Sequence, residues 1–291
     1  MTHAMPLPPV PEPYQLPFHY GALHIVGVDH LVDPEPVRAV LAKQHPGLAA
    51  AEFDGLACVS VNYQLYFAQY PFGGGMTQEV EINVIAHPRG TADRLPRLGY
   101  PDYARGVDQT KLLGIARLHV VCDNPHAIDA GRRLYAEPKH PGWFEVSLPS
   151  LNGLSEDRSW TIHCRDAEAG PEGSLRQREH TLFTLHADPA GLPAEPAAGA
   201  PVTGYGTDEQ GRLLAGPMNV YQPYQLHLLD PELDPQAAAR TRLTVADPGS
   251  EAGRLLLDLL GERPAPAAGI WTYQSAPVAA HQRAYYLPPT A

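Results

Sequence analysis

Residues 123–140 read Asp-Asn-Pro-His-Ala-Ile-Asp-Ala-Gly-Arg-Arg-Leu-Tyr-Ala-Glu-Pro-Lys-His, and they carry more structural information than any other stretch of the chain. Asn124 followed by Pro125 is a favourable N-cap and first-turn pair for a helix. The residues at helical spacing that would face inward are Ile128, Gly131 and Leu134 or Tyr135. Pro138 disfavours a helical conformation in the residue before it. The stretch therefore predicts a short helix that ends just before Lys139.

The sequence on either side of this helix predicts strands. Residues 112–121 form an apolar run, and residues 144–148 alternate between apolar and polar side chains. Lys139 would then lie in a strand–helix–turn–strand unit, at the C-terminal turn of the helix. Gly131 would allow the backbone of the helix to approach a neighbour closely. Taken alone, this setting also fits a solvated lysine that interacts favourably with the helix dipole.

Lysines are scarce, which narrows any chemistry that needs a primary amine. The chain has 21 lysines and arginines together, and only Lys43, Lys111 and Lys139 are lysines. Lys43 ends an amphipathic pattern typical of a surface helix, residues 36–43, and Lys111 precedes the first of the two strands. Lys139 has the most constrained setting of the three.

Residues 123–140 resemble the signature of the acetoacetate decarboxylase family, D-N-x-x-A-I-x-x-G-R-x-L-x-A-x-P-K-K. In that family the first lysine of the pattern forms a Schiff base with a keto acid, and Lys139 stands at its position. The resemblance implies a mainly β (α+β) fold, namely a closed antiparallel β-barrel or cone with a few short helices. The last lysine of the pattern is replaced by His140.

A nucleophilic lysine must lose its proton, since a free lysine has a pKa of about 10.4. Desolvation lowers the pKa of an amine, and so does a neighbouring cation. His140 would be a pKa-tuning or proton-relay neighbour, but an imidazole is only partly charged near neutral pH. We therefore expect desolvation to supply most of the lowering at Lys139.

Glu79 and Glu81 alternate with apolar residues within residues 79–85, so they share one face of a predicted strand. That face could be the solvated side of an amphipathic strand, or it could line a cavity inside a barrel. The resemblance implies that Glu79 is a general acid or base, and Glu81 is the reserve candidate for that role. Glu81 is also expected to bind the substrate.

The chain departs from the family at two further positions. Family members have an arginine just before the first strand, whereas residues 19–26 contain none, and Tyr20 is the candidate occupant. A glutamate expected near residues 57–65 is also missing, because no acidic residue occurs from Gly55 through Gln78. Asn62 and Arg132 complete the expected substrate-binding set. These losses weaken decarboxylation as the specific reaction.

The composition indicates one globular domain over residues 1–291, with a proline-rich arm at 1–14 and loop insertions at 89–110 and 187–212. A net charge of −11 argues against nucleic acid or an anionic membrane as a partner. Three cysteines without a C-x-x-C pair suggest reduced thiols in the cytoplasm. We also expect a helix at 254–260 and strands at 220–229 and 270–287.

The 14 histidines are scattered, and those in strand-like runs show no metal-ligand spacing. These strand histidines are His24, His119 and His163. The sequence therefore predicts neither a metal nor a cofactor.

Together these features predict a homo-oligomeric Schiff-base lysine enzyme that acts on a small keto acid. It would be a carbon–carbon lyase, working by decarboxylation or by aldolase or dehydratase chemistry. The alternative is a non-catalytic protein that binds a small molecule in the same barrel.

Overall fold

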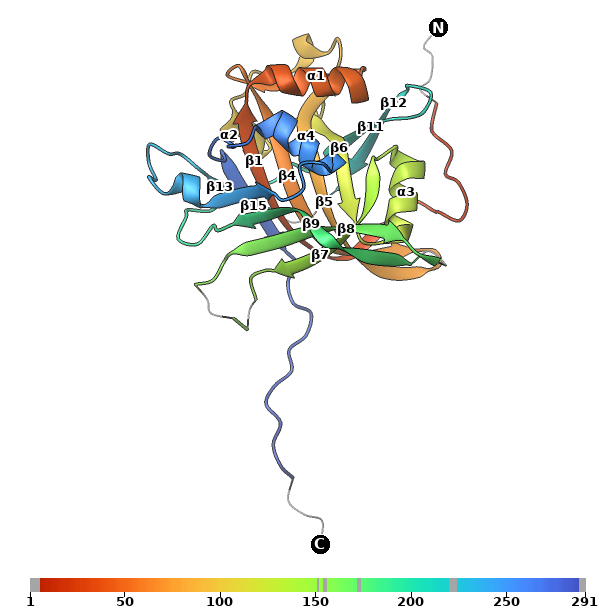
Figure 1. The fold of residues 1–291 in the computed structure, drawn as a ribbon, viewed down its shortest axis with the longest axis vertical. Helices are drawn as coiled ribbons and strands as arrows, with labels where there is room; N and C mark the ends of the chain where they lie inside the picture. Colours follow the sequence, from red (N-terminus) through yellow and green to blue (C-terminus); the bar gives the residue numbers. More distant parts are fainter. Residues whose placement is uncertain (1–5, 151, 154–155, 172–173, 220–223, 288–291) are drawn as a thin grey trace.

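The computed structural model describes residues 6–150, 152–153, 156–171, 174–219 and 224–287. These residues form a mainly β fold with four α-helices and one large sheet (Figure 1). The strands are β1 His19–Val32, β2 Leu48–Ala50, β3 Glu52–Phe53, β4 Leu56–Tyr70, β5 Gly73–Pro88, β6 Gly114–Cys122, β7 Lys139–Ser147, β8 Trp160–Ala169, β9 Leu175–Ala187, β10 Glu195–Ala197, β11 Val202–Thr207, β12 Leu213–Met218, β13 Tyr224–Leu228, β14 Thr241–Val245 and β15 Gly269–Gln274. The helices are α1 Pro34–Gln44, α2 Tyr100–Arg105, α3 Pro125–Tyr135 and α4 Glu251–Leu260, with 3-10 turns at Ala92–Arg94 and Ala237–Ala239.

The sheet is mixed, and the strand pairings found among the described residues leave it open. The strands follow the order β10-β13-β15-β1-β4-β5-β6-β7-β8-β9-β14, and β11 branches from β6. Strand β6 pairs in parallel with both β7 and β11. After β6 the chain crosses over through helix α3 and enters β7 in the same direction as β6. Such a crossover makes the β6–β7 pair parallel. The expected mainly β fold with a few helices is confirmed, but the expected closed antiparallel barrel or cone is not found among the described residues, where the sheet is mixed.

The central strands β4 and β5 separate an apolar face from a polar one. Val61 pairs with Ile82 and Tyr63 with Val80, and these side chains belong to the main hydrophobic core. The alternate positions carry polar side chains, all of them buried: Asn62, Gln64, Glu79, Glu81 and Asn83. A buried polar face needs hydrogen-bond partners, so this face is where a functional site is expected.

A β-bulge in β6 determines which of its side chains face the polar side. Ile82 pairs with His119 but Asn83 pairs with Arg117, so Leu118 is an extra residue in the ladder. Side chains of an unbroken strand alternate, and an inserted residue reverses that alternation. Arg117 and His119 therefore lie on opposite faces of β6, although they are only two residues apart.

The unit β6–α3–β7 confirms the predicted strand, helix and strand. The Asn124 side chain caps α3 by accepting a hydrogen bond from the His126 amide nitrogen at 2.9 Å. Ala136, in the left-handed conformation with φ of 51°, ends the helix. Lys139 is the first residue of β7 instead of part of the last helical turn. The Lys139 side chain therefore lies on one face of the sheet, and not at the C-terminal turn of the helix where the sequence predicted it.

Other predicted segments were met in part. Helices α1 and α4 cover the two predicted helices. The expected loop at 89–110 contains α2, and the one at 187–212 contains β10 and β11. Residues 220–223 of one predicted strand lie outside the described residues, and 224–228 form β13.

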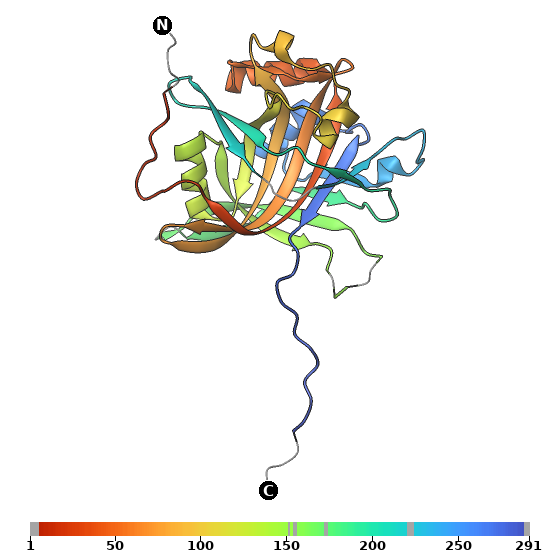
Figure 2. The same cartoon turned by 180° about the vertical axis from the view of Figure 1, so that it is seen from behind.

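The segment 270–287 is a strand only as far as Gln274. Beyond it, residues 276–287 are exposed and run away from the body of the protein (Figures 1 and 2). Tyr14, at the end of the proline-rich N-terminal segment, instead packs on α3, where its hydroxyl donates to Asp129 at 2.6 Å. No helix among the described residues is long and apolar enough to cross a membrane.

Candidate active site

A cavity of about 330 Å³ opens on the polar face of the sheet, between β1, β4, β5, β7 and α3. It is lined by both aromatic and charged side chains. Its aromatic lining residues include Phe18, Tyr20, Tyr66, Tyr70, Tyr135 and Tyr273. Its charged lining residues are Glu79, Glu81, Arg117, Glu137 and Lys139. The cavity therefore joins Lys139 to both predicted glutamates, which lie sixty and fifty-eight residues earlier in the sequence.

Lys139 is buried, with 4% of its surface exposed. Its Nζ atom donates a hydrogen bond to Glu79 Oε2 at 2.6 Å and lies 3.4 Å from Glu137 Oε2. Burial disfavours the ammonium form, but the Glu79 and Glu137 carboxylates outweigh it and raise the pKa of Lys139. The expectation that desolvation lowers this pKa is therefore wrong.

Helix α3 packs directly on this lysine through Gly131. A Cβ atom at position 131 would lie 2.6 Å from Lys139 Cε and 2.5 Å from Glu137 Oε2. A side chain at position 131 would therefore force the ends of the Lys139 and Glu137 side chains to shift. The predicted close approach at Gly131 is confirmed, and its partner is the Lys139 side chain.

Glu79 is buried beside Lys139 and also accepts a hydrogen bond from the Tyr66 hydroxyl at 3.2 Å. Burial raises the pKa of Glu79, the Lys139 ammonium opposes this, and the neighbouring Glu81 and Glu137 carboxylates add to the rise. A carboxyl group with a raised pKa that touches an ammonium can exchange a proton with it directly. Glu79 thus has the geometry of the acid or base predicted for it.

Glu81 is held in a different state by Arg117. Its Oε1 atom accepts from Arg117 Nε at 2.7 Å, and its Oε2 atom accepts from Asn83 Nδ2 at 2.9 Å. Burial works against the carboxylate, but Arg117 and these hydrogen bonds keep the pKa of Glu81 below its usual value. Arg117 also lies 3.3 Å from Glu137 Oε1, so it links two of the carboxylates. Glu81 therefore acts as a fixed charge and Glu79 as the exchangeable one.

Tyr20 lies where the sequence placed it, on the cavity wall, with its ring 5.3 Å from that of Tyr66 in an edge-on contact. Asn62 lies outside this cavity: it lines a neighbouring one of about 130 Å³ and donates to Glu81 at 3.3 Å. Its position follows from the register, which pairs Asn62 with Glu81 and Gln64 with Glu79.

Arg132 and His140 do not line the cavity. Arg132 is on the exposed side of α3, and its Nε atom donates to the Lys139 carbonyl oxygen at 2.8 Å. It can fix the backbone of Lys139 but is not placed to bind a substrate. His140 follows Lys139 in β7, so its side chain points to the opposite face of the sheet. The tuning or relay role expected for His140 fails for this reason.

Arg117 and Glu137 were missed by the sequence analysis. Glu137 had a usable signal, because Pro138 favours an extended Glu137 and side chains two residues apart on an extended chain share a side. Arg117 had none, since its orientation depends on the bulge in β6.

No family model matches the chain, and no curated protein matches it in sequence. Three solved structures are similar to it in fold. An acetoacetate decarboxylase-like enzyme from Sphingomonas wittichii RW1 is 15% identical, with 88% of each chain covered and a TM-score of 0.48. An acetoacetate decarboxylase is 14% identical, with 89% of this chain and 86% of that chain covered and a TM-score of 0.46. The acetoacetate decarboxylase from Legionella pneumophila subsp. pneumophila str. Philadelphia 1 is 12% identical, with 94% and 92% covered and a TM-score of 0.46. The similarity thus extends over about nine-tenths of the chain at low sequence identity.

Proposed function

We propose that this protein is a Schiff-base lysine enzyme that acts on a small keto acid and makes or breaks a carbon–carbon bond. One observation carries the proposal: the Lys139 amine is buried in a cavity of small-molecule size, 2.6 Å from a carboxylate that can take its proton. Of the other two lysines, Lys111 lines only the smaller cavity of about 130 Å³, and Lys43 lines neither that cavity nor the larger one.

The reaction would begin with a proton transfer from Lys139 Nζ to Glu79. The neutral amine then adds to the carbonyl carbon of the substrate, and a proton from the amine reaches the new hydroxyl group by way of Glu79. Glu79 next donates its own proton as that group leaves as water. The product is a cationic iminium at Nζ, which faces the carboxylates of Glu79 and Glu137 in place of the original ammonium. The ammonium and the iminium carry the same positive charge, so the carboxylates of Glu79 and Glu137 stabilise both of them.

The iminium withdraws electrons from the bond one carbon away. A keto acid with its carboxylate there would lose carbon dioxide, and a hydroxylated substrate would undergo retro-aldol cleavage or lose water. The resulting enamine needs a proton, and the Glu79 carboxylate, with the Tyr66 hydroxyl beside it, is placed to deliver one. In retro-aldol cleavage Glu79 would first take up the proton of the substrate hydroxyl, and in decarboxylation it would first take up a proton from water. Both outcomes use the same residues, so the groups on the substrate decide between them.

The charges of the cavity set a condition on a keto acid. Three carboxylates and two cations line the cavity, which gives a formal charge of −1 when all are ionised. A further substrate carboxylate would be repelled unless one of these groups takes up a proton. Binding of a keto acid should therefore strengthen as the pH falls.

A second function is favoured by the protonated state of Lys139. Because Glu79 and Glu137 raise the pKa of Lys139, the resting side chain is an ammonium and not a nucleophile. Such a cavity could bind a carbonyl compound by hydrogen bonds alone, as a non-catalytic binding protein. The three described cysteines of the protein are buried and form no disulfide. We therefore propose a cytoplasmic location for the protein, whichever of the two functions it has.

Product analysis separates the two functions. The purified chain and its Lys139→Met variant, which keeps the volume of the side chain, are incubated with acetoacetate and with pyruvate. Carbon dioxide release and carbon NMR of the products are followed. An enzyme gives products that depend on Lys139. Thermal stabilisation of the chain by the keto acid with no product from either compound would support the binding protein instead.

A further inference from the structure

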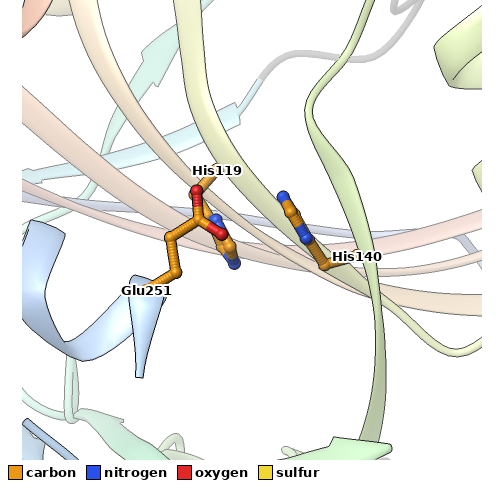
Figure 3. A group of neighbouring side chains, drawn as sticks. All are labelled: His119, His140 and Glu251. Atoms are coloured by element: carbon orange, nitrogen blue, oxygen red, sulfur yellow. The ribbon is translucent and has the colours of Figure 1, made fainter. Parts of the chain in front are cut away.

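Three metal-ligand side chains from distant parts of the sequence meet on the face of β6 and β7 opposite Lys139. They are His119 of β6, His140 of β7 and Glu251, the first residue of α4 (Figure 3). One candidate ligand atom from each of the three lies within 4.8 Å of the other two. Neither the spacing in sequence nor the scattered histidines indicated this cluster.

The fold explains why these side chains meet. The bulge at Leu118 turns His119 away from the cavity, and β7 starts in parallel register with Val120 opposite Lys139 and Val121 opposite His140. His119 and His140 therefore share one face, with their rings stacked at a centroid distance of 4.1 Å. The Ser250 side chain caps α4 by accepting from Gly253, and this cap fixes where Glu251 begins the helix.

His119 gives an independent sign that the cluster lacks a partner. Only 4% of its surface is exposed, yet its Nδ1 atom has no hydrogen-bond partner in the described structure. An unsatisfied buried polar atom is unfavourable, so such an atom generally has a ligand, a water or an ion as its partner.

We propose that His119, His140 and Glu251 form a three-ligand site for a divalent transition-metal ion of the Zn²⁺ type. Two imidazoles and one carboxylate, with water in the remaining position, match the ligand set that such ions accept in proteins. Mg²⁺ and Ca²⁺ prefer oxygen ligands throughout, so the site should discriminate against them.

Binding requires a small rearrangement, because a metal lies in the plane of each imidazole that it binds. The two rings are nearly parallel, with an interplanar angle of 11°, and must incline toward each other. His140 is half-buried and Glu251 is exposed, so both have room to move toward the buried His119. The positive charge of Arg132, which lies near His140, opposes the binding of a cation.

The site is separate from the Schiff-base chemistry. Lys139 and His140 are neighbours in β7 but face opposite sides of the sheet, so a bound ion would not enter the cavity. It would connect α4 to β6 and β7, and therefore fix the strand whose first residue is Lys139. We expect the bound ion to hold these elements together. Metal binding at this site does not depend on whether the proposed reaction occurs.

The test is a metal titration of the full chain after treatment with a chelator and dialysis. Zn²⁺ binding is measured by competition with a chromophoric chelator, and Co²⁺ binding by its visible absorption bands. The variants His140→Gln and Glu251→Gln each remove one metal ligand. Neither side chain is fully buried, so both variants should fold, and thermal unfolding checks this. His163→Gln is the matched control, because His163 is an exposed strand histidine outside the cluster.

We expect one equivalent of Zn²⁺ to bind to the chain and to raise its melting temperature, while Mg²⁺ does neither. Each ligand variant should bind at least about tenfold more weakly, since even indirect partners of metal ligands cost that much. The control should match the unaltered chain. No stoichiometric binding, or equal binding by all three variants, would show that the cluster is not a metal site.

Discussion

At the scale of single residues, burial alone does not set the state of Lys139. The side chain is as buried as a nucleophilic lysine needs to be, yet two carboxylates within 3.4 Å keep it protonated. In the proposed reaction the reactive amine would therefore be produced by proton transfer and not by desolvation. Glu79 and Glu81 are two residues apart on one strand face, but Arg117 neutralises only Glu81, and this difference gives the two carboxylates different roles.

The first prediction concerns Glu79→Gln. This change removes the negative charge that raises the pKa of Lys139, so adduct formation with a keto acid should begin at lower pH than in the unaltered chain. It also removes the proton acceptor, so the maximal rate should fall by about 10²- to 10⁴-fold. The pH profile of adduct formation measures both effects. An unchanged pH dependence would remove Glu79 from its role beside Lys139.

The second prediction concerns Glu81→Gln, which breaks the buried pair with Arg117. Arg117 would keep Glu137 at 3.3 Å but lose its strongest partner, so the free energy of unfolding should fall by about 3 kcal/mol. Urea denaturation measures this loss. The control is Arg176→Gln, because Arg176 is an exposed residue paired with Glu168, and its urea midpoint should not change. Equal effects of the two changes would contradict the buried pair.

At the scale of secondary-structure elements, the unit β6–α3–β7 was largely predictable from sequence. The Asn124 cap, the small residue at position 131 and the proline at 138 each act locally, and each has the expected effect. The start of β7 at Lys139 was not predictable, because it depends on pairing with β6. One consequence is that His140, placed beside the lysine by the sequence, lies on the other face of the sheet and joins His119 there.

The third prediction concerns Gly131→Ala in α3. Alanine suits a helix, so the helix itself should tolerate the change. The new methyl group would, however, lie within 2.6 Å of Lys139 Cε and displace the amine from Glu79. We expect a folded protein that loses most of its adduct formation, as measured by circular dichroism and mass spectrometry.

Gly47→Ala is the control for this change, since its new Cβ would meet Leu213 Cβ at an ordinary distance of 3.7 Å. This variant should form the adduct like the unaltered chain. Full adduct formation by Gly131→Ala would show that α3 does not position Lys139.

At the scale of the whole molecule, the mainly β character was predictable, and the topology was not. The long strands were visible as alternating and apolar runs, but the pairing of β1 with β15 joins residues about 250 positions apart. Such long-range pairing leaves no local pattern. The segment 89–110 gave a similar difficulty: it has a loop-like composition, but Tyr100 of α2 donates to the buried Asp29 of β1 at 2.9 Å and anchors it.

The fourth prediction tests that anchor with Tyr100→Phe. The change removes one donor to Asp29, which keeps Trp271 Nε1 at 3.2 Å. Leaving a buried carboxyl short of a partner should lower the free energy of unfolding by about 1–3 kcal/mol. Urea denaturation measures it, and Tyr285→Phe in the exposed C-terminal segment is the control, with no expected change. An unchanged free energy of unfolding in Tyr100→Phe would mean that Asp29 does not hold α2.

The expected homo-oligomer stays a prediction, which light scattering can test.

The central claim is that Lys139 forms a covalent iminium with a keto acid. The most direct measurement incubates the protein with acetoacetate or pyruvate, reduces it with borohydride and maps the added mass on its peptides. Lys43, Lys111 and Lys139 are the only lysines, so each can be assigned separately. We predict a reduced adduct on Lys139 and none on the other two. No adduct on Lys139, or equal labelling of all three lysines, would contradict the claim.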